Sequence, residues 1–272
     1  MYWFEQAPLW IIWLTLSLSL IVAMVAGYSC GKLVRRGSGE SDSSDSQGFL
    51  MSAALALLGL LIAFTFSMAS ARLDARRGAL LEEANAVGTT YLRFQIVDEP
   101  YRSALSKDLL SYLDARHAFF EAGADPSAVD RADDLTGRVE SRMWDTLAGW
   151  VSRHEASTSN VSLLQATNDM FDLAASDRVV REARVPITII RAIVIYSLIA
   201  AFLLGQSFAP KKDIRPFAAT TVFVLVALAI SLILDLDRPA TGTITVSSVP
   251  FDRAAASIRA METARLANRP SN

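Results

Sequence analysis

Few residues of this 272-residue sequence have the types and spacing that enzyme chemistry requires. Its two histidines, His117 and His154, lack the partner histidine of a zinc-binding motif. His117 and Glu121 are four residues apart and could share a metal ion, although this spacing is also typical of a solvated helix face. No phosphate-binding loop, dinucleotide-binding glycine pattern or nucleophile elbow is present. We therefore expect no catalytic residue, no bound metal and no cofactor.

Arg191 is the only charged residue within four long apolar stretches of the sequence. It lies about five residues, or roughly 8 Å, inside its stretch. A charge at the centre of a membrane helix costs about 2.5–3.5 kcal/mol, so it is expected to be paired or to line a polar path. If the last two stretches form a hairpin around Lys211, Asp235 is level with Arg191 and becomes its predicted partner. The alternatives are an arginine that reaches the membrane surface and a role in an ion path.

The second apolar stretch carries two periodic faces. Large residues and one alanine recur on the first face at Ala56, Leu60, Phe64 and Met68. Small residues recur on the second face at Gly59, Ala63, Ser67 and Ala71. The small residues predict close helix packing in lipid. The first face is expected to contact lipid or a neighbouring helix, or, if subunits surround an axis, to form an apolar constriction that gates by dewetting.

Four apolar stretches must position these residues. They run from Pro8 to Gly27, from Gly48 to Ala71, from Pro186 to Gly205 and from Phe217 to Leu234. About 20 apolar residues in a helix cross the ~30 Å hydrocarbon core of a bilayer. None has a proline inside it, so the helical hydrogen bonding that lipid demands is uninterrupted. The sequence predicts an all-α, multi-pass membrane protein with four transmembrane helices.

The rest of the chain predicts a helical bundle on this membrane part. Residues 1–71 hold the first two membrane helices, joined by a flexible Ser- and Asp-rich loop at 37–48. Residues 72–184 form a helical soluble domain between the second and third membrane helices. Residues 185–236 hold the last two membrane helices. The second membrane helix is expected to continue into the soluble domain as one rod, and the last helix of that domain to lead straight into the third membrane helix.

Residues 237–272 are expected to form an extended segment and an amphipathic C-terminal helix. One face of that helix carries Phe251, Ala255, Ile258 and Met261. This apolar face is narrow, so packing on a partner is favoured over contact with lipid.

Charge and cysteine content restrict the partners. The formal net charge of −2 gives no basic field for nucleic acid. Cys30 is the only cysteine, which excludes an intrachain disulfide. It is interpreted as a thiol at the membrane interface or, alternatively, as a lipidation site.

The two short loops are basic, with Lys32, Arg35, Arg36, Lys211, Lys212 and Arg215. The positive-inside rule then places these loops in the cytoplasm and the large domain outside.

Several runs resemble the bacterial bestrophin-like membrane-domain family. They are Gly59 to Met68 leading into Arg72, Asp74, Arg76 and Arg77, then Glu82 to Thr89, Glu99 to Arg102, and Leu234 to Pro239. Bestrophins are pentameric ion channels with four membrane helices, the second of which lines a hydrophobic neck. The resemblance therefore implies a homo-oligomer in a bacterial inner membrane, with Leu60, Phe64 and Ala56 in the neck.

The sequence departs from bestrophins where Leu73 and Asp74 follow Arg72 in place of two tryptophans. Its tail has no acidic cluster resembling their calcium clasp, and their middle region is cytosolic, opposite to the orientation that the basic loops predict. We expect an oligomeric channel for inorganic ions, with anions slightly favoured. The alternative is a non-conducting scaffold or sensor whose helical domain binds a partner or ligand.

Overall fold

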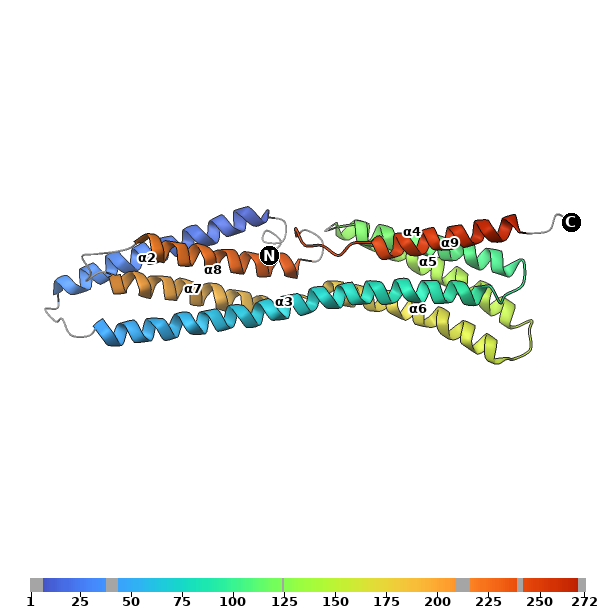
Figure 1. Cartoon of the computed structure of the whole chain (residues 1–272), viewed down its shortest axis with the longest axis horizontal. Helices are drawn as coiled ribbons and strands as arrows, with labels where there is room; N and C mark the ends of the chain where they lie inside the picture. Colours follow the sequence, from blue (N-terminus) through green and yellow to red (C-terminus); the bar gives the residue numbers. More distant parts are fainter. Residues whose placement is uncertain (1–6, 38–43, 124, 209–215, 239–241, 269–272) are drawn as a thin grey trace. The chain divides into compact units, whose positions relative to one another are not determined.

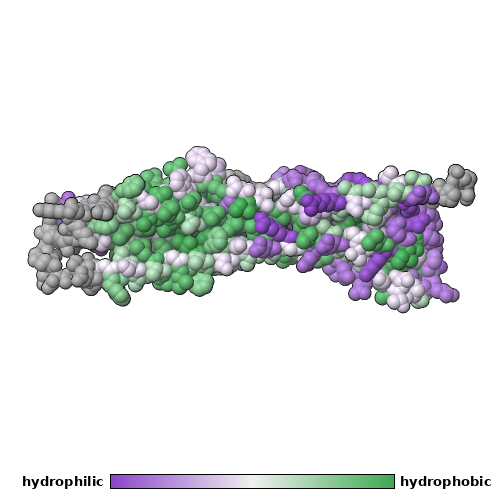
Figure 2. Space-filling view, viewed as in Figure 1, coloured by the Kyte–Doolittle hydropathy of each residue, from purple (hydrophilic) through white to green (hydrophobic). Residues whose placement is uncertain are grey.

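The computed structural model describes residues 7–37, 44–123, 125–208, 216–238 and 242–268, which form helices and irregular segments. The chain divides into two compact units. The apolar unit comprises Met1–Arg72 and Arg184–Ile244, and the polar unit comprises Leu73–Ala183 and Thr245–Asn272. Figure 2 shows hydrophobic residues gathered over the apolar unit and hydrophilic residues over the polar unit.

The apolar unit contains the four predicted apolar helices, labelled in Figure 1. They are α2 (Leu9–Gly37), the first part of α3 (Ser44–Phe94), α7 (Ile187–Phe208) and α8 (Pro216–Asp237). Among the described residues, the regions long and apolar enough to cross a membrane are Leu9–Leu33, Met51–Phe94, Thr158–Phe208 and Phe217–Asp237. The third region contains α7 and the helix before it. The prediction of an all-helical chain with four apolar helices is confirmed.

Helices α2 and α7 pack with their backbones in contact. Gly27 on α2 lies against the Phe202 carbonyl, and Gly205 on α7 lies against the Met24 carbonyl. A Cβ atom built on either glycine would overlap that carbonyl oxygen, so both positions require a residue without a side chain. This pair was not singled out in the sequence, where the stripe that begins at Gly59 predicted the close packing instead.

The polar unit is a bundle around one hydrophobic core. It contains the second part of α3, α4 (Tyr101–Glu121), α5 (Pro126–Val151), α6 (Thr158–Glu182) and α9 (Val249–Ala267). Local sequence signals explain two of the helix starts. Asp125 caps α5 by accepting a hydrogen bond from the Ser127 backbone N–H, and Ser157 caps α6 by accepting from the Asn160 N–H.

Helix α3 runs without a break through 51 residues, which confirms the predicted rod. At ~1.5 Å per residue it is about 77 Å long, more than twice the ~30 Å core of a bilayer. The second predicted continuity is wrong. Helix α6 ends at Glu182 and α7 begins at Ile187. Pro186 accounts for the interruption, because it lacks a backbone N–H and disfavours helical geometry in the residue before it.

Two loop predictions fall partly on residues outside the described ranges. The predicted flexible loop at 37–48 includes residues 38–43, which the structure does not describe, and its later part is helical because α3 begins at Ser44. Lys211, Lys212 and Arg215 also lie outside the described residues.

Candidate functional site

The predicted neck residues lie on an exposed face of α3. Leu60 is 50% exposed and Phe64 is 65% exposed. Ala56 is also exposed, whereas Met68 is half-buried. These fractions are high for large apolar side chains in a helix that packs within its own unit. The face is therefore uncovered in the single chain.

The small-residue face of α3 is uncovered as well. Gly59, Ala63, Ser67 and Ala71 are all exposed. A Cβ atom built on Gly59 would meet no other group within 4 Å. Within this chain the stripe is therefore not the site of close helix packing, which lies at Gly27 and Gly205 instead.

The opposite side of α3 attaches it to the apolar unit. Leu58, Thr65 and Ala69 are nearly inaccessible, at 1%, 2% and 0% exposure. They are spaced by seven and four residues, which places them on one side of a helix with 100° per residue. The Tyr196 hydroxyl on α7 also donates to the Ala54 carbonyl oxygen at 3.1 Å. Docking by this side turns Leu60 and Ser67 away from the unit.

Arg191 and Asp235 do not form the predicted ion pair. The Asp235 carboxylate is buried and accepts hydrogen bonds from the backbone N–H of Thr243, at 2.8 Å, and from the Thr243 hydroxyl. Arg191 is exposed on α7. Equal depth in a two-helix hairpin predicted the pair, but the segment that follows α8 returns and supplies donors that the hairpin alone does not contain.

The end of α8 is instead a junction of chain segments. Asp237 accepts a hydrogen bond from the backbone N–H of Val185 at 2.8 Å, just before α7. Arg238 donates to the Ala7 carbonyl oxygen at 2.9 Å, just before α2. Both side chains are buried, so these hydrogen bonds are shielded from water. Asp237 and Arg238, which belong to one of the runs behind the bestrophin resemblance, thus hold the starts of two apolar helices.

A buried ionic cluster lies in the polar unit and was not predicted from the sequence. The Arg116 guanidinium on α4 is 0% exposed and holds the Glu83 carboxylate of α3 through two hydrogen bonds of 2.7 Å. It also donates to Asp177 of α6 at 3.0 Å. The Tyr112 hydroxyl donates to Glu83 at 2.6 Å. We call these four residues the Arg116 cluster.

The cluster joins three helices through charged hydrogen bonds between buried side chains. Two aromatic rings complete its enclosure, with the Arg116 guanidinium carbon 4.6 Å from the centre of the Phe119 ring and 5.4 Å from that of Phe120. Burial and the adjacent Glu83 charge raise the pKa of the Tyr112 hydroxyl well above its usual value, so it remains a donor. No local sequence pattern indicated the cluster, because its hydrogen-bonded pairs are separated by 29 to 61 positions.

The C-terminal helix α9 packs within the polar unit. Phe251, Ala255 and Ile258 are buried, whereas Met261 is 37% exposed, so the predicted apolar face is narrower than expected. Its partner is the chain's own core, including residues of α4. His117, the candidate metal ligand, lies beside α9 with its Nδ1 atom 3.0 Å from the Asp252 carboxylate. Across the described ranges, no three His, Cys, Asp or Glu side chains converge as a metal site would require.

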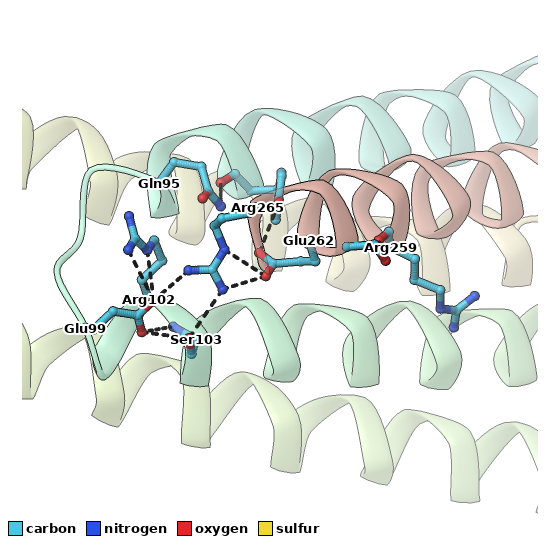
Figure 3. Close-up of polar contacts among 9 residues, drawn as sticks. Gln95, Glu99, Arg102, Ser103, Arg259, Glu262 and Arg265 are labelled. Carbon is cyan, nitrogen blue, oxygen red and sulfur yellow. Dashed lines mark hydrogen bonds and ion pairs between the residues drawn. The ribbon is translucent and has the colours of Figure 1, made fainter. Parts of the chain in front are cut away.

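A polar network fastens the end of α9, as Figure 3 shows. Arg265 donates to Glu262 on its own helix and to Glu99 before α4, both at 2.6 Å. Glu99 also accepts from the Ser103 hydroxyl at 2.6 Å and from Arg102. The Ser103 hydrogen bond is the largest of the effects that lower the pKa of Glu99 to about 2.

Acidification is expected to loosen this attachment of α9. Because the pKa of Glu99 falls from 4.5 to about 2 on folding, its stabilising contribution is present above pH 4.5 and is lost as the pH falls through about 2. In a Glu99→Gln variant this part of the acid sensitivity should disappear. Limited proteolysis of the C-terminal helix at graded pH, with an acid-stable protease, measures the effect. Equal acid sensitivity in wild type and Glu99→Gln would contradict it.

Together, the four apolar helices and the uncovered apolar face of α3 define a multi-pass membrane protein. The bestrophin-like domain family matches residues 18–251, which is most of the chain. The protein therefore belongs to the bestrophin-like family. No curated protein sequence matches this chain.

Solved structures of similar fold include a bacterial bestrophin homolog and a membrane protein. A point mutant of a bacterial bestrophin homolog from Klebsiella pneumoniae is 11% identical, with 94% of this chain and 99% of that chain covered and a TM-score of 0.66. A second structure of a homolog from this organism is 12% identical, with coverages of 92% and 96% and a TM-score of 0.62. A mutant described as a membrane protein is 11% identical, covering 98% and 100%, with a TM-score of 0.60. At these identities the likeness shows the fold.

Proposed function

We propose that this protein is a homo-oligomeric ion channel of the bacterial inner membrane, in which the exposed face of α3 lines the pore. The observation that carries the proposal is the exposure of Leu60 and Phe64 on a helix docked by its opposite side. In a ring of subunits, this face would be turned toward a shared axis or a neighbouring α3. Family membership supports the same arrangement, since the bestrophins that this sequence resembles are pentameric channels.

The residues of α3 suit the two tasks that a pore helix performs. Small side chains at Gly59 and Ala63 would allow neighbouring helices to approach closely. Ala56, Leu60 and Phe64, followed by the half-buried Met68, would form the apolar neck, where ions lose part of their hydration. We propose inorganic ions as the permeating species, with anions slightly favoured. No step of this function calls for catalysis.

The experiment compares two phenylalanines on the same helix. Phe64 and Phe66 are both exposed, at 65% and 41%, but two helical positions separate them by about 200°. Phe64→Ala is expected to widen the neck, admit water and raise ion flux into reconstituted liposomes several-fold. The matched control Phe66→Ala should leave the flux unchanged.

The channel proposal would be overturned if neither wild type nor Phe64→Ala showed flux of chloride, sodium or potassium in the liposome assay. A stability loss of about 3–5 kcal/mol in Phe64→Ala would instead indicate a side chain packed against a neighbour. The oligomeric state in detergent gives a separate check, because a pore on α3 requires a ring and a monomer cannot form one.

A non-conducting scaffold or sensor is the second candidate, and a groove in the polar unit favours it. The groove lies between α3 and α9 and has a volume of about 350 Å³. Its walls include Leu81 and Gly88 of α3 and Pro250, Ile258 and Met261 of α9. A partner or ligand bound here would contact both helices. No measurable ion flux from a stable oligomer would favour this function.

A further inference from the structure

The Arg116 cluster places two carboxyl groups on one nitrogen atom. Nη2 of Arg116 donates to Glu83 at 2.7 Å and to Asp177 at 3.0 Å. Both carboxyls are buried, and burial and the Glu83 charge raise the pKa of Asp177. Two ionised carboxyls this close together repel each other, and a proton on one of them removes the repulsion. The shared nitrogen therefore favours one proton between the two carboxyls, as in other close carboxyl pairs.

A third carboxyl group adds to the same environment. Glu140 on α5 is half-buried, and its burial raises its pKa to about 7. The negative charges of Glu83 and Asp133 also raise the pKa of Glu140, whereas the positive charge of Arg116 lowers it. Near neutral pH, Glu140 is therefore divided between its neutral and charged forms.

The charged and titratable groups around the cluster come from all four long helices of the bundle. They are Arg76 and Glu83 on α3, Tyr112 and Arg116 on α4, Asp133 and Glu140 on α5, and Asp177 and Arg181 on α6. Arg116 lies within ion-pairing distance of both Glu83 and Asp177. Arg76 also donates to the Ala183 carbonyl, and Arg181 to the Gly123 carbonyl. One guanidinium thus directly contacts two carboxyls, and a proton on one of them lowers their mutual repulsion.

We propose that the Arg116 cluster and Glu140 form a pH-sensitive lock, which holds α3, α4, α5 and α6 together when protonated and loosens when the protons leave. In the closed state, Glu83 is the carboxylate paired with Arg116, and Asp177 carries a proton from solvent that it donates to Glu83. Loss of this proton leaves two buried carboxylates that repel each other and share one cation. Ionisation of Glu140 adds a third negative charge nearby.

The direction of the pH response follows from proton binding. The folded state binds more protons than the unfolded state wherever a carboxyl is kept neutral by the fold, so stability falls as the pH rises. For Glu140 the contribution is complete below pH 4.5 and is lost as the pH rises through about 7. The proton on Asp177, whose pKa burial also raises, contributes with the same sign. The lock holds α3, the helix that also carries the proposed neck residue Leu60. The lock proposal itself does not depend on ion conduction.

The first test measures the melting temperature of the full-length protein in detergent from about pH 5 to about pH 9. The wild-type melting temperature should fall by about 5 °C or more as the pH rises across this range. Glu140→Gln should remove part of the slope, and Asp177→Asn combined with Glu140→Gln should remove most of it. Both changes keep the shape of the neutral acid, so the double variant should fold. Asp145→Asn, an exposed carboxylate on α5, is the matched control and should keep the wild-type slope.

The second test detects the shared proton directly by infrared spectroscopy. At neutral pH, wild type should show the carbonyl stretch of a neutral, buried carboxylic acid, and Asp177→Asn should lack that band. Raising the pH should remove the band from wild type. The lock would be overturned if the melting temperature of the double variant fell with pH as steeply as that of wild type. It would also be overturned if Asp177→Asn left the carboxylic-acid band unchanged. Because neither readout involves flux, a failed channel proposal would leave both tests valid.

Discussion

An Arg116→Met variant is expected to lose about 3–5 kcal/mol of stability, because it leaves Glu83 buried without a cation. This is a large share of the ~5–15 kcal/mol that stabilises a typical native protein. The Glu83 carboxylate would keep the Tyr112 hydroxyl as a donor but would lose both hydrogen bonds from the guanidinium. Thermal or denaturant unfolding in detergent measures the loss.

The matched control breaks another ion pair of the polar unit. Arg142 donates to Asp108 at 2.7 Å, but its side chain is 55% exposed. Solvent screens such a pair, so Arg142→Met should cost no more than about 1 kcal/mol. Combining Arg116→Met with Glu83→Gln should recover part of the first loss by removing the uncompensated charge. Equal stabilities of Arg116→Met and Arg142→Met would show that the buried cluster stabilises the protein no more than the exposed ion pair does.

Gly205→Ala is expected to separate α2 from α7 and to destabilise the apolar unit by about 2–3 kcal/mol. The added Cβ would overlap the Met24 carbonyl oxygen and would lie 2.9 Å from the Tyr28 nitrogen. Both neighbours are backbone atoms, so no side-chain rotation can relieve the overlap. The yield of monodisperse protein in detergent and its melting temperature report the change.

A glycine-to-alanine substitution on α3 should change the stability in the opposite direction. Glycine inside a helix is less favourable than alanine by about 0.5–1 kcal/mol. Gly59 has open space around it within the chain, so Gly59→Ala should leave the fold intact or stabilise it slightly. A Gly205→Ala variant that is as stable as Gly59→Ala would contradict the close contact between α2 and α7.

Local sequence patterns predicted the parts of the fold that depend on local physics. Apolar length predicted four membrane-type helices, and unbroken helical periodicity predicted that α3 continues beyond its apolar stretch. Composition did not distinguish which small residues are in contact, because Gly59 and Gly205 both belong to the apolar stretches of the sequence. Which pair of helices brings its glycines together depends on the packing of the whole unit.

The polar interactions were the least predictable part. Asp235 was assigned to Arg191 by depth alone, and the true donors come from Thr243, in a segment whose path the sequence does not specify. The Arg116 cluster joins three helices whose relative rotation decides which charges turn inward. Glu83 and Arg116 look like ordinary solvated charges until that rotation is known.

The return of α9 to the polar unit has a consequence for how the chain is made. Tyr91 and Glu262 form one hydrogen bond across 171 positions, and the second half of the apolar unit, Arg184–Ile244, is synthesised between them. At about 5–20 residues per second, a ribosome takes about 10–35 s to cover that distance. Until then, the surface that Phe251 and Ile258 will cover stays exposed on the nascent chain. Completion of the polar unit therefore comes last in biogenesis, after all four apolar helices have left the ribosome.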